Sequence, residues 1–235
     1  MRPDGRSVSQ LRPVVLERNA NPYAEGSCLV RFGGTLIHCT ASVEVGVPPF
    51  KKGSGQGWVT AEYAMLPRAT SERTNRERNG PGGRSQEIQR LIGRSLRAGM
   101  GRWDFGEYTI KIDCDVLQAD GGTRTASITG ASVALADACS WLAERTGKPS
   151  PFGQLVAAVS VGVVGGEVCL DLAYTEDKDA EVDANVVMRA PSDLVEVQGT
   201  GEQGVFSRAQ LDRMLDLADA GLAELFAAQR KALGW

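Results

Sequence analysis

Residues 108–129, YTIKIDCDVLQADGGTRTASIT, combine the patterns of a strand, a glycine turn and a helix start in immediate succession. From Tyr108 to Val116, apolar and polar side chains alternate with a period of two, which is typical of a half-buried strand. Asp120, Gly121 and Gly122 break the alternation. Apolar residues then recur at helical spacing over residues 128–142. This stretch therefore predicts a strand–turn–helix unit, around which the rest of the chain must pack.

The turn of this unit is a candidate anion-binding site. Free backbone N–H groups at a helix start carry partial positive charge, and glycines allow an anion to approach the backbone closely. Gly122, Thr123 and Arg124 would form the cradle, and the guanidinium of Arg124 would add charged donors. Many strand–glycine–helix turns are purely structural, so this alternative stays open until the rest of the chain is considered.

The composition is that of an ordinary globular protein. The chain has 235 residues, of which 42% are hydrophobic and 23% charged, enough for one large domain or two small ones. No apolar run approaches the length of a membrane span, and residues 1–6 lack the apolar region of a signal peptide. We therefore expect a cytoplasmic protein with no membrane partner.

The cysteines and the single histidine argue against several chemistries. The five cysteines are widely spaced and never form a C-x-x-C pair, so neither a disulfide framework nor a zinc site is indicated. We expect core thiols. His38 lies in the apolar run Leu36-Ile37-His38-Cys39, where a structural role is expected, and this argues against a histidine-based triad.

Charge is distributed unevenly although the net charge is only −3. Residues 68–102 contain nine arginines and three glutamates, whereas residues 167–202 contain ten acids and two bases. A basic segment and an acidic cluster on one protein suggest that the first binds a polyanion and the second a cation. Solvated loops would give the same counts, and charge alone does not separate the two interpretations.

Residues 68–84, RATSERTNRERNGPGGR, have almost no apolar side chain and predict a long exposed loop. Its arginines are Arg68, Arg73, Arg76 and Arg78. Because arginine binds phosphate in bidentate fashion, RNA is a reasonable partner. Helical spacing resumes from Ile88, with Ser85 as the expected N-cap, so Arg84 would stand immediately before a second helix start.

Hairpins followed by long helices occur twice along the chain, and no linker separates them. This order predicts a single α+β domain over residues 1–235, with two layers, mixed sheets packed against helices, and an internal βαβ-like echo. The remaining elements expected are hairpins over 27–43 and 157–172, strands over 58–65, 185–188 and 194–198, and a final helix with a capping box of Ser207 and Gln210.

The candidate site residues form a chemically coherent set. Arg84 and Arg124 stand at helix starts, and the acidic stretch supplies the carboxylate pair Asp177 and Asp183. No side-chain nucleophile accompanies them. Phosphate held by arginines and backbone amides, with a metal held by carboxylates, indicates phosphoryl chemistry in which a substrate oxygen attacks.

Five stretches carry a specific resemblance. They are RPDGR at the start, GQGWVTAEYAMLPRAT from Gly55, GGRSQEIQRLIGRSLRA from Gly82, DCDVLQADGGTRTASITGA from Asp113 and DLAYTEDKDAEVDANVV from Asp171. Over essentially the whole chain the sequence resembles bacterial ribonuclease PH. The resemblance implies the ribonuclease PH fold and a phosphorolytic 3′-to-5′ exoribonuclease, also called tRNA nucleotidyltransferase. Such an enzyme trims the 3′ ends of tRNA precursors reversibly, using inorganic phosphate and releasing nucleoside 5′-diphosphates.

The resemblance also implies roles for individual residues. Phosphate binding falls on Arg84 and on Gly122, Thr123 and Arg124, and catalysis and Mg²⁺ binding fall on Asp177 and Asp183. It further implies RNA contacts from the arginine loop and a homohexamer built as a trimer of dimers. Two positions depart from the family pattern: Ala184 replaces a methionine and Ser85 replaces a threonine. Neither change removes a charged group.

Two rival functions remain to be compared. A non-catalytic RNA-binding subunit of a ring-shaped processing complex would be marked by loss of the arginines or aspartates, and all four are present. A nucleotide-binding kinase would need the GxxxxGK[ST] signature, which the sequence lacks.

Overall fold

The computed structural model describes residues 2–235, which form two β-sheets and four α-helices. The α+β class expected from the sequence is confirmed. The first sheet has the order β1-β2-β3-β5-β4 and the second the order β7-β6-β8-β9. The first sheet consists of β1 (Val14–Arg18), β2 (Gly26–Phe32), β3 (Thr35–Val45), β4 (Trp58–Met65) and β5 (Tyr108–Gln118). The second consists of β6 (Val156–Val164), β7 (Glu167–Leu170), β8 (Val182–Arg189) and β9 (Asp193–Gly201).

Among the strands within residues 2–235, only β4 and β5 pair in parallel, and helix α1 (Gly83–Ala98) connects them as a βαβ unit. All other neighbouring strands are antiparallel, as expected of hairpins and meanders. The sequence pattern did not reveal β1, an edge strand of five residues. The predicted internal echo of the βαβ unit is only partial. In the second half of the chain, the helix between β7 and β8 is the short α3 (Tyr174–Asp177).

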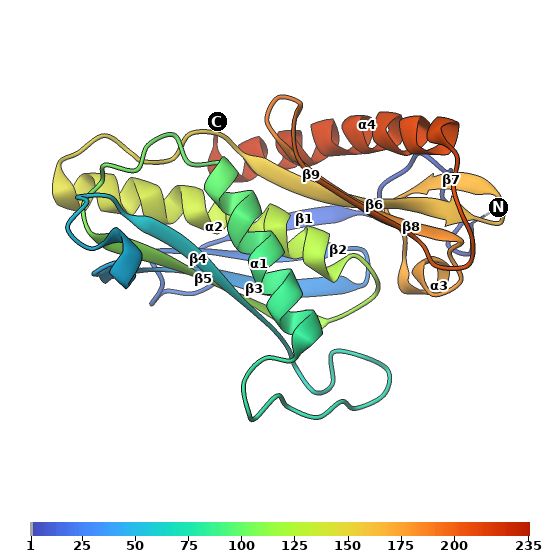
Figure 1. Cartoon of the computed structure of the whole chain (residues 1–235), viewed down its shortest axis with the longest axis horizontal. Coiled ribbons are helices and arrows are strands. Elements are labelled where there is room, and N and C mark those ends of the chain that lie inside the picture. Colours follow the sequence, from blue (N-terminus) through green and yellow to red (C-terminus); the bar gives the residue numbers. More distant parts are fainter. Residues whose placement is uncertain (1) are drawn as a thin grey trace.

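Helix α2 (Thr123–Thr146) contacts β2 and β3 of the first sheet and β6 of the second, so it joins the two sheets. Helix α4 (Arg208–Leu233) packs against β6 and β7 and against β1 (Figure 1). A capping box of Ser207 and Gln210 opens α4, as predicted. The Gln229 side-chain amide of α4 donates to the carbonyls of Thr129 and Val156 at 2.9 and 2.8 Å, which fixes α4 to both α2 and β6.

By length and composition alone, α2 would be apolar enough to cross a membrane, with a mean hydropathy of 1.2 over its best window. This differs from the sequence expectation that no run approaches that length. In the structure 78% of that window is buried inside the protein, so α2 serves as the central core helix.

The five cysteines are buried free thiols, as the sequence predicted. Burial raises the pKa of the Cys28 thiol to about 12, which keeps it protonated and chemically inert. Between β4 and α1, the arginine loop projects from the body of the protein (Figure 1).

Candidate active site

The turn between β5 and α2 can be built only from glycines. Gly121 and Gly122 have φ of 72° and 64°, in the left-handed region. A β-carbon at Gly121 would lie 2.6 Å from the Leu172 carbonyl oxygen and 2.8 Å from the Tyr174 nitrogen. The turn is thus packed directly against the chain that leads into α3. Gly122 is the N-cap of α2 and supplies no side-chain cap, which leaves the first N–H groups of the helix available to an anion.

Two contacts fix the first turn of α2. The Tyr63 hydroxyl of β4 lies 2.9 Å from the Thr123 hydroxyl, and both side chains are buried. Nη1 of Arg124 lies 3.6 Å from a carboxylate oxygen of Glu87 in α1, so the starts of the two helices meet. Burial raises the pKa of the Tyr63 phenol, while its bond to Thr123 and the charges of Arg84 and Arg124 lower it. Both guanidinium groups therefore act on the same buried phenol.

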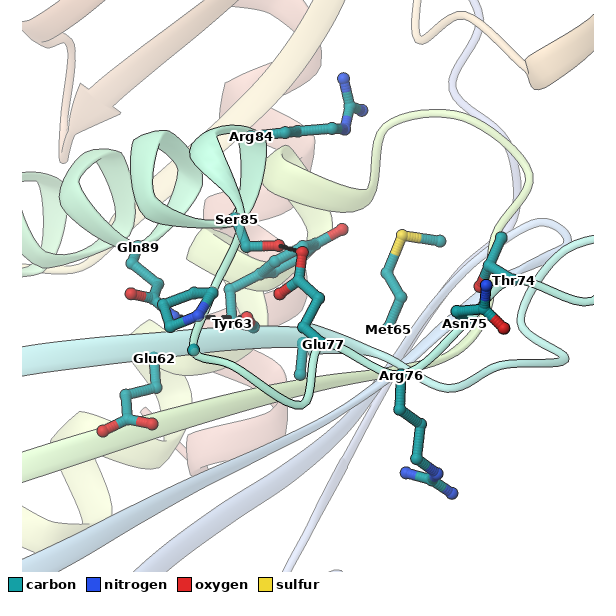
Figure 2. A pocket seen from close by; sticks show the side chains of 13 residues that line it. Glu62, Tyr63, Met65, Thr74, Asn75, Arg76, Glu77, Arg84, Ser85 and Gln89 are labelled. Atoms are coloured by element: carbon teal, nitrogen blue, oxygen red, sulfur yellow. Dashed lines mark hydrogen bonds between the residues drawn. The ribbon is translucent and has the colours of Figure 1, made fainter.

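The start of α1 differs from the sequence prediction. The N-cap is Gly82 and the helix begins at Gly83, so Arg84 lies inside the first turn and Ser85 is not the cap. Ser85 is buried and its hydroxyl donates to the Glu77 carboxylate at 3.0 Å, which ties the arginine loop to the helix. Figure 2 shows the exposed Arg84 side chain pointing away from this contact. Sequence pattern alone could not place the cap, because the N-cap is Gly82, which has no side chain to act as a capping group.

The two aspartates come from neighbouring elements, Asp177 from the end of α3 and Asp183 from the start of β8. Neither carboxylate receives a hydrogen bond or an ion pair from any described residue within residues 2–235. Burial raises the pKa of Asp177. Burial and the charges of Asp177 and Glu202 raise that of Asp183 to about 6, although the positive charges of Arg124 and Arg84 oppose both shifts. The charges of Arg84 and Arg124 therefore act on both aspartates.

The second sheet adds polar groups that the sequence did not single out. Asn185 stands two residues beyond Asp183 on β8, on the same face, and pairs across the ladder with Ser160 of β6. The Ser160 hydroxyl accepts the Leu172 N–H at 3.0 Å and lies within 3.9 Å of the position of a β-carbon at Gly122. A lone polar residue inside the apolar run of β6 was the available signal, since a buried hydroxyl needs a partner.

The arginine loop shares a cavity with Arg84 and Tyr63. A cavity of about 470 Å³ separates the loop from β4 and the start of α1, and Tyr63, Thr74, Arg76, Glu77 and Arg84 are among its lining residues (Figure 2). The four predicted RNA-binding residues are exposed and form no ion pair within the part of the chain that the structure describes; they are Arg68, Arg73, Arg76 and Arg78.

The structure also places Ser85 and Ala184, the two positions at which the sequence departs from the pattern that it resembles. Ser85 uses its hydroxyl, a group that threonine also has, to bind Glu77. Ala184 is buried and, being adjacent to Asp183 on a strand, points to the opposite face, where it lies 3.4 Å from the position of a β-carbon at Gly199.

Family models match two parts of the chain: residues 10–140 match the 3′ exoribonuclease family, domain 1, and residues 154–221 match domain 2 of that family. Ribonuclease PH of Corynebacterium glutamicum is 60% identical over 98% of this chain and 96% of its own length. Ribonuclease PH of Mycolicibacterium smegmatis is 58% identical over 99% of this chain and 91% of its own.

Solved structures show the same fold at lower identity. Rice (Oryza sativa) Rrp46 has a TM-score of 0.80 at 20% identity, covering 99% of this chain and 100% of its own. The Archaeoglobus fulgidus exosome with RNA bound to the active site has a TM-score of 0.79 at 22% identity, covering 95% and 91%.

Proposed function

Since this chain belongs to the 3′ exoribonuclease family of ribonuclease PH, we propose that Arg84, the turn Gly122–Arg124, and Asp177 with Asp183 form its phosphorolytic active site. The chain is a phosphate-dependent 3′-to-5′ exoribonuclease that trims tRNA precursors and releases nucleoside 5′-diphosphates. The observation that supports the site assignment is the packing of the glycine turn against the chain before α3, together with the charges of Arg84 and Arg124, which act on both aspartates.

Inorganic phosphate would bind at the start of α2. The N–H groups at Gly122, Thr123 and Arg124 offer donors, and the guanidinium groups of Arg124 and Arg84 neutralise the charge. Tyr63 holds the Thr123 hydroxyl through their 2.9 Å contact, so this side chain is already oriented before phosphate arrives. Such a cradle presents one phosphate oxygen to the 3′-terminal phosphodiester of RNA.

In the chemical step, that oxygen attacks the phosphorus of the last phosphodiester in line. A bond forms between the phosphate oxygen and this phosphorus, and the bond from phosphorus to the 3′ oxygen of the penultimate nucleotide breaks. The leaving 3′ oxygen takes up a proton, which one of the carboxyls Asp177 and Asp183 passes to it. The products are a nucleoside 5′-diphosphate and an RNA shortened by one nucleotide. Because a phosphodiester is exchanged for a phosphoanhydride, the step is reversible.

The carboxylate pair fits a Mg²⁺ ion. The two carboxyls are half-buried and receive no hydrogen bond, and the charge of Asp177 raises the pKa of Asp183. A divalent cation bound between them would offset this repulsion. We propose that Asp177 and Asp183 hold this ion. When bound, Mg²⁺ supplies positive charge near the leaving oxygen.

The RNA beyond the last nucleotides would contact Arg68, Arg73, Arg76 and Arg78, whose guanidinium groups are exposed and unpaired within the described residues.

We also propose a homohexamer, a trimer of dimers, in the cytoplasm. Exposed apolar side chains support a subunit contact: Val45 and Phe50 are 88% and 69% exposed at one end of the first sheet. Light scattering tests the hexamer, and cell fractionation tests the compartment.

The function is tested by incubating the protein with a 3′-extended tRNA, with and without inorganic phosphate, and identifying the released mononucleotides. Nucleoside diphosphates that appear only with phosphate are expected. Monophosphates released equally fast without phosphate would contradict phosphorolysis. RNA binding without any release would favour the non-catalytic ring subunit.

A further inference from the structure

The segment before β1 contains buried arginines that the active-site chemistry does not use. Arg2, Arg6 and Arg12 are only 7%, 8% and 4% exposed, although arginine is seldom buried unless it is paired. From residue 2 to residue 13 the chain has no helix or strand. A few backbone bonds, such as that from the Leu170 N–H to the Val8 carbonyl at 2.8 Å, and many side-chain ion pairs fix this segment, which we call the N-terminal arm (residues 2–13).

Arg2 binds the segment of residues 170–176, which leads to Asp177. Its Nε and Nη2 donate to the two carboxylate oxygens of Glu176, each at 2.6 Å. Its Nη1 donates to the Leu170 carbonyl at 2.7 Å, and Nη2 also donates to the Asp171 carbonyl at 2.9 Å. One guanidinium thus binds both ends of the segment from the end of β7 to α3.

Glu176 is bound from a second side. Its carboxylate, 2% exposed, accepts the Ala173 N–H at 3.0 Å and so closes the first turn of α3. Arg6 adds weaker contacts of 3.4 Å to both Glu176 and Asp171. Glu176 directly precedes Asp177, so the arm binds the residue next to that carboxylate in the chain.

Arg12 connects the segment before α3 to the turn Gly122–Arg124, which we call the phosphate turn. Its Nε and Nη2 donate to the two oxygens of the fully buried Asp171, at 3.0 and 2.7 Å, and its backbone N–H adds a bond of 2.7 Å. The remaining nitrogen, Nη1, donates to the carbonyl of Asp120, the residue that opens the glycine turn. A single side chain therefore bridges the two halves of the active site.

We infer that Arg2, Arg6 and Arg12 are positioning residues, which act through Glu176 and Asp171 to fix Asp177 relative to the phosphate turn. This inference rests on the proposed function, which assigns Asp177 and the turn to catalysis. Buried ion pairs are poor sources of stability, because desolvation offsets their attraction, whereas forked guanidinium–carboxylate pairs define distance and direction. An error of about 1 Å in a catalytic group can lower turnover about a hundredfold.

Glu176→Gln tests the role with little change in shape. The amide oxygen can still accept the Ala173 N–H, but the negative charge that Arg2 and Arg6 bind is lost. Asp137→Asn is the matched control, since Arg18 binds Asp137 through the same pair of nitrogens, at 3.0 and 2.6 Å. Asp137 lies about 20 Å along α2 from Thr123 by helix geometry, and so is remote from the site.

We expect Glu176→Gln to lower kcat on a short RNA at least about tenfold, with the KM for phosphate within about twofold of wild type. Asp137→Asn should lower Tm less than Glu176→Gln, because its ion pair is more exposed, and should keep the wild-type kcat. A Glu176→Gln enzyme whose kcat matches that of Asp137→Asn would overturn the positioning role. Should Glu176→Gln not fold, Arg2→Lys, which keeps the charge but loses the fork, is judged by the same criterion.

The wild-type reaction is measured first, which separates the two hypotheses. Absence of phosphate-dependent diphosphate release by the wild type would overturn the proposed function. An active wild type together with an unimpaired Glu176→Gln variant would overturn only the role of the arm.

Discussion

Nη1 of Arg124, in the first turn of α2, lies 3.6 Å from the carboxylate of Glu87 in α1. The Arg124 side chain is 18% exposed and that of Glu87 is 47% exposed, so the arginine is largely enclosed while its partner faces solvent. An ion pair of this length with an exposed partner contributes little to stability, and the arginine stays available to an incoming anion.

Arg124→Ala should raise the KM for phosphate strongly, because a charge-assisted contact to a desolvated phosphate contributes about 2 kcal/mol, or roughly thirtyfold. Glu87→Gln should change it only about twofold, since the pair is weak. Initial rates over a range of phosphate concentrations measure both. An Arg124→Ala enzyme with the phosphate dependence of the wild type would remove Arg124 from the cradle.

Asp177→Asn and Asp183→Asn should each lower turnover about a hundredfold or more while RNA binding survives, because the amide keeps the shape but loses the charge. Turnover is measured with Mg²⁺ present, and binding by fluorescence anisotropy of a labelled RNA. If either variant turns over at near the wild-type rate, that aspartate is structural.

The pH dependence of the free energy of unfolding should reflect the raised pKa of Asp183. Its pKa in the folded protein is about 6, above the ordinary 3.8. A raised carboxyl pKa means that ionisation opposes folding, so the loss of stability begins as pH rises through about 4 and is complete above about 6. Without metal, Asp183→Asn should be about 1–3 kcal/mol more stable than wild type at neutral pH, with the difference vanishing below about pH 4.

Urea unfolding in EDTA across this pH range measures the difference between the two proteins. Equal stability at neutral pH would show that burial and Asp177 do not strain the carboxyl. Added Mg²⁺ should then stabilise the wild type more than the variant, because only the wild type retains both carboxylates.

Arg73→Ala combined with Arg76→Ala should weaken trimming of precursor tRNA and flatten its salt dependence. Each phosphate contact adds about 0.7 to the salt slope on single strands, and slightly more on duplex. Phosphorolysis of a very short oligonucleotide, which reaches only Arg84 and Arg124, should hardly change. Initial rates at several salt concentrations measure both effects.

Arg208→Ala with Arg213→Ala is the matched control, because it removes two exposed arginines from α4 instead of the loop. Light scattering must show that the oligomer of the loop variant is unchanged, since a broken assembly would reduce both activities. Equal loss on long and short RNA by an intact oligomer would place the loop inside the active site.

Local sequence patterns determined most of the elements. Alternation over residues 108–116 predicted β5, helical spacing predicted α2, and the capping box at Ser207 fixed the start of α4. These features depend on near neighbours in the chain, so a single sequence reveals them. The same holds for the arginine loop, whose lack of apolar residues excludes it from any core. The cap of α1 was missed because a glycine occupies it.

The sequence also named the chemical groups of the site, but not the relationships that make it one site. Only the tertiary structure decided that the turn after β5 packs against the chain before α3, where Gly121 leaves no room for a β-carbon beside Leu172. It alone showed that Arg2 binds Glu176 and that Arg12 bridges Asp120 and Asp171. These partners lie more than a hundred residues apart, and which buried charge meets which depends on how the two sheets pack on α2. Local periodicity carries no information about such pairings.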